Sequence, residues 1–134
     1  MLKLIVGVKG TGKTKTLIEM VNKAAAESKG SVICIERGSK LNYDVTHKAR
    51  LVDCGSYKIE DAEALYGFIA GITASDHDIT DLFVDSALKI CADDLAAFEL
   101  FVKKLDKLVA SAGYNCIMTV SANPEDCASL REYM

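Results

Sequence analysis

The sequence predicts an α/β fold, a three-layer αβα sandwich built around a mostly parallel sheet of five strands. Short apolar and β-branched runs alternate along the chain with longer segments whose apolar residues recur at helical spacing. Strands that are separated by helices favour a parallel sheet with helices on both faces. The chain has 134 residues, half of them hydrophobic, which suits one domain spanning residues 1–134.

The predicted strands are continuous apolar runs, as expected where both faces of a sheet are buried. They span residues 2–6, 31–35, 50–54, 82–84 and 116–120, and a turn is expected over residues 75–80.

Three segments with an apolar stripe are predicted to be helices, and they span residues 16–28, 60–73 and 94–112. Gly30 and Gly113 are expected to end the first and the third of them as C-caps. Asn123 and Pro124 predict the N-cap and the first turn of a last short helix.

Composition and charge limit the kind of partner. The net charge of −3 and the pI of about 5.4 give no electrostatic footprint for nucleic acid or an anionic membrane. No apolar run approaches the ~18 residues that a membrane span needs. Gly7 and Lys9 interrupt the N-terminal apolar run before it could form a signal peptide. We therefore expect a cytoplasmic protein without membrane partners.

The five cysteines form no Cys-x-x-Cys pair, and an odd number does not suit a closed disulfide framework. Cys34, Cys54 and Cys116 fall in apolar segments and are expected to be buried. Cys91 and Cys127 are expected to be more exposed.

The segment Gly7-Val8-Lys9-Gly10-Thr11-Gly12-Lys13-Thr14 matches the phosphate-binding loop pattern, Walker A, at every position. It lies between a predicted strand and a predicted helix, where successive backbone N–H groups form an anion-binding nest. Lys13 can reach the terminal phosphates of a nucleotide, and the Thr14 hydroxyl can ligate Mg²⁺. The alternative is a glycine-rich turn with a solvated Lys13.

Asp85 ends an apolar run at the predicted end of the fourth strand, which is the Walker B pattern. A carboxylate there can hold the magnesium ion opposite Thr14, whereas the alternative is an aspartate that only forms a turn. Asp81, at the opposite end of that run, is expected to be structural.

Four features together resemble the RecA-like branch of the P-loop NTPases over about residues 1–123. They are the phosphate loop, the strand end Ile35-Glu36, the Walker B segment Val84-Asp85-Ser86 and the polar end of the last strand. The resemblance implies a minimal Mg²⁺-dependent ATPase, a hydrolase that binds ATP. It also implies the strand order three, two, four, five, one.

The resemblance also implies roles for single residues. Glu36 would orient or activate the water that attacks the γ-phosphate, and the alternative for Glu36 is a solvated acid at a strand end. Lys13 would assist catalysis at the phosphates. Ser121 would sense the γ-phosphate, with Asn123 as an alternative. An arginine commonly stabilises the transition state, and Arg37 could lie near the site, although a surface charge or an arginine from a neighbouring subunit is the alternative.

The nucleotide base is less clearly encoded. Asn22-Lys23 has the first two letters of a guanine-specificity motif, but it lies in the first helix and its aspartate is missing. Adenine is therefore the default.

Two departures from the RecA-like pattern leave other functions open. The extra strands that would cover the edge of the first strand are missing, so we expect a homo-oligomer or a protein partner at that edge. No equivalents of the DNA-binding loops are recognisable. The alternatives are a nucleotide-dependent binding module or switch with little turnover, and a DNA-associated recombinase-like accessory ATPase. A relative of pilus or secretion motors ranks lower.

Overall fold

The computed structural model describes residues 1–134 and contains one sheet of five strands. The strands are β1 (Leu2–Gly7), β2 (Ser31–Glu36), β3 (Arg50–Asp53), β4 (Ile79–Val84) and β5 (Asn115–Ser121). They lie in the order β1-β5-β4-β2-β3, and every neighbouring pair is parallel. The α/β class and the expected strand order are confirmed.

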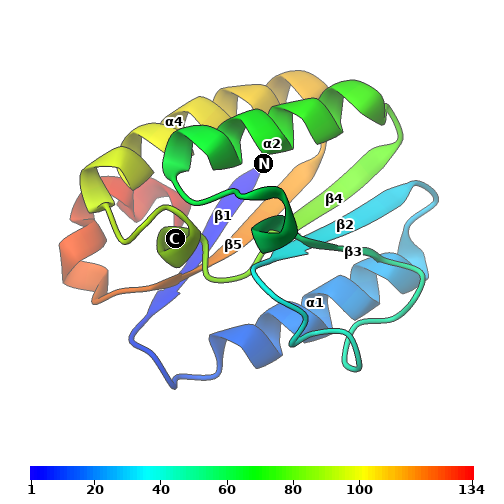
Figure 1. The fold of residues 1–134 in the computed structure, drawn as a ribbon, viewed down its shortest axis with the longest axis horizontal. Helices are drawn as coiled ribbons and strands as arrows, with labels where there is room; N and C mark the ends of the chain where they lie inside the picture. The colour runs from blue at the N-terminus through cyan, green and yellow to red at the C-terminus, as the bar shows by residue number, and fades with distance from the viewer.

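Helices cover both faces of this sheet, which gives the three layers seen in Figure 1. Helix α1 (Lys13–Glu27) lies on one face, and α2 (Ala62–Ser75) and α4 (Leu95–Ala112) lie side by side on the other. The short elements are η1 (Cys54–Tyr57), α3 (Ala87–Ile90) and the 3₁₀ segment η2 (Pro124–Tyr133). No helix has the combination of length and apolarity that would let it traverse a bilayer.

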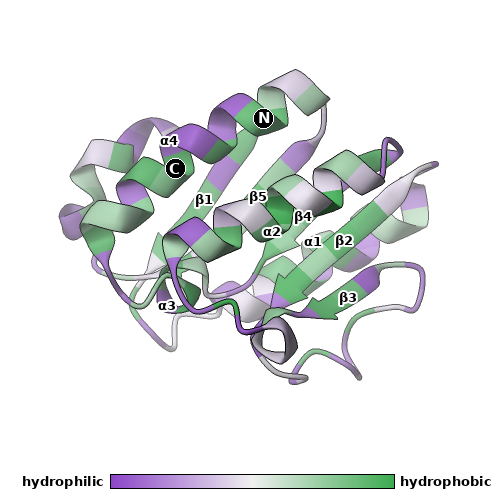
Figure 2. Cartoon of the chain, turned by 45° about the horizontal axis from the view of Figure 1, so that its top comes forward, coloured by the Kyte–Doolittle hydropathy of each residue, from purple (hydrophilic) through white to green (hydrophobic).

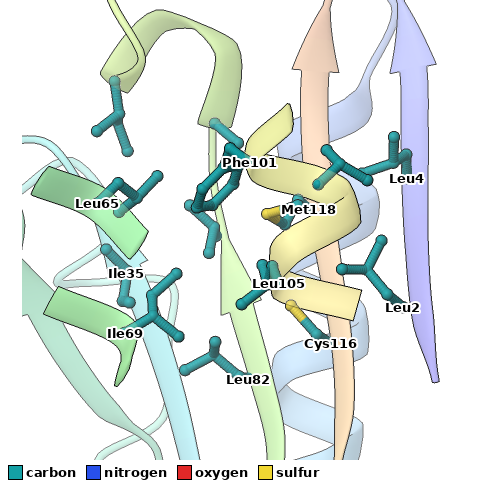
Figure 3. Packing of buried hydrophobic residues seen from close by; sticks show 14 of the residues in the cluster. Leu2, Leu4, Ile35, Leu65, Ile69, Leu82, Phe101, Leu105, Cys116 and Met118 are labelled. Carbon is teal, nitrogen blue, oxygen red and sulfur yellow. The ribbon is translucent and has the colours of Figure 1, made fainter. Parts of the chain in front are cut away.

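The larger part of the core lies between the sheet and the pair α2–α4 (Figure 3). Leu82 and Met118 project from the sheet toward Leu65, Phe101 and Leu105 of the two helices. Side chains alternate between the two faces of a strand, so every second residue of the central strands contributes to this layer.

A smaller cluster fills the space between the sheet and α1. Cys34 and Phe83 on the sheet are buried here with Leu17 and Val21 of the helix. The remaining residues of α1 are mostly polar. Figure 2 shows hydrophilic and hydrophobic segments along α4 and a largely hydrophobic β2, with α1 behind the sheet in that view. The position of α1 is thus set by a few aliphatic residues one turn apart.

The region before β4 differs from the sequence-based prediction. The predicted turn over residues 75–80 is too long, because α2 continues to Ser75 and β4 already begins at Ile79. The chain reverses in fewer residues because the Asp76 carboxylate accepts a hydrogen bond from the backbone N–H of Asp78 (2.9 Å). Helix α3 was not predicted, and four residues are too few to show a helical period.

Gly30 does not have the role expected of it. The C-cap of α1 is Ser28 in extended conformation, whereas Gly113 ends α4 as predicted, with φ at 81°. Gly30 instead lies where two backbones meet, because a Cβ atom at this position would come within 2.1 Å of the carbonyl oxygen of Asp78. The glycine is required by a close approach between the start of β2 and the start of β4.

All five cysteines are buried and free, so the expectation that Cys91 and Cys127 are more exposed is wrong. Both side chains pack into the larger cluster, which the sequence around them does not reveal. Burial raises the pKa of the Cys91 thiol to about 12, which keeps it protonated and unreactive at neutral pH.

Strand β1 lies at an edge of the sheet and pairs only with β5. Hydrogen bonds from Cys116 to Met1 and from Ala122 to Gly7 connect it to that neighbour at both ends. Because backbone groups alternate sides along a strand, the N–H and C=O groups of Leu2 and Leu4 point toward the free edge. Association through this edge stays a prediction.

We expect Gly30→Ala to lower the free energy of unfolding by about 1–3 kcal/mol, the usual cost of a steric conflict with fixed backbone. Unfolding in urea, followed by circular dichroism, measures this loss. Gly67→Ala is the matched control, because Gly67 lies in the middle of α2 and a Cβ atom added there would meet no atom within 4 Å. It should raise the same free energy by about 0.5–1 kcal/mol, since alanine favours helix. Equal effects of the two substitutions would contradict the close approach at Gly30.

Candidate functional site

The predicted site residues meet at the carboxyl edge of the sheet. Gly7, Glu36 and Ser121 are the last residues of β1, β2 and β5, and Asp85 directly follows β4. Because all strands are parallel, these ends lie on the same edge, where α/β proteins bind ligands. The blue turn between β1 and α1 in Figure 1 is the glycine-rich loop of this edge.

The backbone of this loop depends on its glycines. Gly10 and Gly12 have φ angles of 87° and 82°, in the left-handed region that glycine adopts without strain. Gly7 does not lie in that region. It serves a close approach, since a Cβ there would lie 2.9 Å from the Thr11 hydroxyl oxygen.

The start of α1 offers unpaired hydrogen-bond donors. Its N-cap is Gly12, which has no side chain to accept a hydrogen bond, and its first turn carries no acidic residue. The first N–H groups of a helix have no partner inside the helix and carry the positive end of the helix dipole. In this 15-residue helix they face the loop and can bind an anion.

The carbonyl oxygen of Val8 organises the two side chains of the loop. It accepts hydrogen bonds from the Thr11 hydroxyl (2.8 Å) and from the Lys13 ammonium group (2.9 Å). The ammonium group is thereby held over the loop, next to the donors of α1. Val8 itself is exposed, with 52 % of its surface accessible, so the outer rim of the loop is open to solvent.

Thr14 and Asp85 form the second part of the site. The Thr14 hydroxyl lies 3.2 and 3.3 Å from the two carboxylate oxygens of Asp85. One hydroxyl and one carboxylate are hard oxygen ligands of the kind that Mg²⁺ accepts, together with phosphate oxygens and waters. The chain has no cluster of three or more His, Cys, Asp or Glu side chains that could hold a metal by themselves. The donor set therefore fits a magnesium ion that is bound together with phosphates.

Thr119 of β5, which the sequence patterns did not single out, forms a hydrogen bond with the Asp85 carboxylate. Its side chain is 1 % exposed, donates to Asp85 Oδ1 (2.7 Å) and accepts from the backbone N–H of Ser86 (2.7 Å). Thr119 is the one polar side chain in the apolar run 116–120, and this was the available signal. Threonine is β-branched and common in strands, so the sequence alone gave no reason to assign Thr119 a role in the site.

Glu36 is buried beside Asp85. Ile35 pairs with Val84 across β2 and β4, so the next residues, Glu36 and Asp85, are neighbours on the α1 face. The Glu36 side chain is 3 % exposed and accepts a hydrogen bond from the backbone N–H of Leu41 (3.1 Å).

This environment changes the acidity of Glu36. Burial raises the pKa of its carboxyl group above the ordinary value of 4.5, and the negative charge of Asp85 adds to that rise. Backbone hydrogen bonds from Leu41 and Lys40 lower it in part. Glu36 is thus a carboxylate whose affinity for a proton is increased next to a possible metal ligand.

A cavity of about 200 Å³ opens next to these two acids. Its lining consists of Glu36, Arg37, Lys40, Asp85, Ser86, Lys89 and Ile90. The Arg37 guanidinium group donates to the carbonyl oxygens of Lys89 (3.3 Å) and Ile90 (3.4 Å), at the end of α3. Arg37 is thus an exposed residue that also lines this cavity, and α3 adds Lys89, which the sequence did not point to.

The structure separates the two candidates at the end of β5. Ser121 is exposed and pairs with Gly7 in the register of β5 and β1, so it lies beside the glycine-rich loop. The Asn123 side chain accepts from the backbone N–H of Glu125 (3.1 Å) and caps η2, as its pattern predicted. Of the two, Ser121 is the side chain that is free to face a ligand in the loop.

Asn22 has a structural task. Its amide donates to the carbonyl oxygen of Asp44 (2.8 Å) and accepts from the backbone N–H of Thr46 (2.9 Å). These bonds attach the segment after β2 to α1, and they occupy both ends of the amide. The resemblance of Asn22-Lys23 to a guanine-specificity motif therefore has no counterpart in the geometry.

Searches against protein-family models and against curated proteins return no match to this chain.

We expect Glu36→Gln to raise the melting temperature at pH 7, measured without nucleotide or metal. A carboxyl group whose pKa is higher in the folded chain than in the unfolded chain favours folding at low pH. That contribution is lost as the pH rises through the raised pKa, so at pH 7 the buried charge destabilises the fold. Glutamine keeps an acceptor for Leu41 and removes the charge.

The gain should shrink as the pH falls and should vanish below about pH 4.5, where Glu36 is protonated in both states. Differential scanning calorimetry from pH 4 to pH 8 follows this change. Glu19→Gln, at an exposed position of α1, is the control and should show no such pH dependence. A constant effect of Glu36→Gln across this range would contradict the assigned environment.

Proposed function

We propose that this protein binds MgATP in the loop Gly7–Thr14 and hydrolyses it as a minimal RecA-like P-loop ATPase. The observation that carries the proposal is the pairing of the uncapped start of α1 with the contact between Thr14 and Asp85. The first feature suits the phosphates of a nucleotide, and the second suits the magnesium ion that accompanies them. The sheet order agrees with the RecA-like pattern.

Different residues of the loop would bind different parts of the nucleotide. The N–H groups around Gly10 and Gly12 would donate to the β-phosphate, and Lys13 would move from the Val8 carbonyl to the β- and γ-phosphates. Mg²⁺, held by Thr14 and Asp85, would neutralise the charge that develops on the phosphate oxygens.

Glu36 would act on the attacking water. It is next to Asp85, and its raised pKa makes it a stronger base than an exposed glutamate. Arg37, on the wall of the same cavity, could place positive charge beside the γ-phosphate. Ser121, beside Gly7, lies where a hydroxyl group could contact that phosphate.

A nucleotide-dependent switch uses the same binding residues but turns over little. The feature that favours it is Ser86, which occupies the position after Asp85 where many P-loop ATPases have a glutamate. A turnover assay separates the two functions. Adding single-stranded DNA at low and high salt tests the DNA-associated alternative, because binding to phosphates weakens with salt.

We expect ATP with Mg²⁺ to raise the melting temperature of the wild type and to leave that of Lys13→Ala unchanged. A ligand at 100 times its Kd stabilises the folded state by about 2.7 kcal/mol. Thermal unfolding with ATP, ADP or GTP, each with Mg²⁺ or EDTA, measures this. Lys15→Ala is the matched control, since Lys15 is an exposed lysine of the same helix. A shift that survives in Lys13→Ala would contradict the proposed site.

We expect Glu36→Gln to lower kcat for ATP hydrolysis by about 10²–10⁴-fold, the usual contribution of a general base. Its MgATP-induced thermal shift should equal that of the wild type, because Glu36 does not hold the nucleotide. Phosphate release at saturating ATP is the measurement. A wild type that binds MgATP without turnover would refute the hydrolase and establish the switch.

A further inference from the structure

Thr119 occupies a position that the proposed function does not yet use. It lies on β5, between the strand that leads into the loop and the strand that ends at Asp85. We propose that Thr119 is a positioning residue that orients the Asp85 carboxylate for the metal and thereby sets the affinity of the site for Mg²⁺. This inference rests on the proposed function, because it concerns the same metal.

The direction of the hydrogen bonds at Thr119 is determined by its partners. The backbone N–H of Ser86 can only donate, so it takes an acceptor position of the Thr119 oxygen (2.7 Å). The single hydroxyl proton of Thr119 is then directed to Asp85 Oδ1 (2.7 Å). A donor at this distance holds Oδ1 in one direction and leaves the other carboxylate oxygen toward Thr14 and the loop.

The contacts on the other side of Asp85 are longer. Thr14 lies 3.2 and 3.3 Å from the two carboxylate oxygens, so the Thr119 contact is the tighter of the two. The main chain of Asp85 is fixed separately, because its N–H donates to the carbonyl oxygen of Ile35 (2.9 Å). Thr119 therefore controls the rotation of the Asp85 carboxyl group, while the hydrogen bond to β2 fixes the Asp85 main chain.

Thr119 also supports the turn that follows Asp85. Ser86 has φ at 57° and ψ at 49°, in the left-handed region that is strained for a non-glycine residue. The hydrogen bond from its N–H to Thr119 holds this conformation in place. The Thr119 side chain itself is 1 % exposed, so its hydroxyl group is shielded from bulk water.

The comparison of Thr119→Val with Thr119→Ser tests this role. Valine has nearly the shape of threonine but cannot donate or accept a hydrogen bond, whereas serine keeps the hydroxyl group. Loss of a partner that orients a metal ligand typically weakens metal binding by about 10–100-fold. We expect Thr119→Val to weaken the apparent Mg²⁺ affinity by about tenfold or more, and Thr119→Ser to stay within about threefold of the wild type.

The measurement is a titration of Mg²⁺ at fixed ATP, read as the thermal midpoint, with a parallel ATP titration in EDTA. A positioning role changes the Mg²⁺ titration and leaves ATP binding in EDTA unchanged. If Thr119→Val does not fold, Thr119→Cys, which has a similar size and only a weak donor, takes its place with the same expected direction.

Three results would overturn the inference. An unchanged Mg²⁺ titration in Thr119→Val would mean that Asp85 orients itself without Thr119. Equal weakening of ATP binding with Mg²⁺ and in EDTA would assign Thr119 to the fold alone, and so would a Thr119→Ser as weak as Thr119→Val. A wild type that shows no Mg²⁺-dependent ATP binding would instead refute the proposed function itself.

Discussion

The rest of the site depends on the hydrogen bonds that hold the carboxylate of Asp85. This residue follows β4, its main chain is bonded to β2, and its side chain contacts β5 and α1 through Thr119 and Thr14. Four elements from both halves of the chain therefore converge on one charged group. Two hydroxyl groups, those of Thr14 and Thr119, donate hydrogen bonds to its oxygens.

The burial of Glu36 lowers the stability of the fold at neutral pH. A glutamate that is 3 % exposed, beside another acid, costs free energy at neutral pH. Leucine in its place would extend the cluster formed by Cys34 and Leu41. Proteins accept such costs where a group with a shifted pKa has a chemical task, which makes Glu36 the clearest sign of function outside the loop.

The sequence was sufficient for features that local chemistry dictates. The loop motif, the strand order and the cap at Asn123 each depend on residues close together in the chain or on a family pattern. Features that depend on distant partners were missed. Gly30 is required by the carbonyl of Asp78, and Cys127 is buried by elements far away in sequence. The role of Thr119 could be inferred only once β4 and β5 were known to be neighbours.

The strand order explains why a polar residue is needed at position 119. The loop follows β1 and Asp85 follows β4, but β5 lies between these strands. Thr14 therefore reaches Asp85 across the end of β5, and the side chain below that contact must come from β5. An apolar side chain there would leave both the carboxylate and the N–H of Ser86 without a buried partner. A small hydroxyl residue satisfies both groups, because one oxygen atom donates to the carboxylate and accepts from the N–H of Ser86.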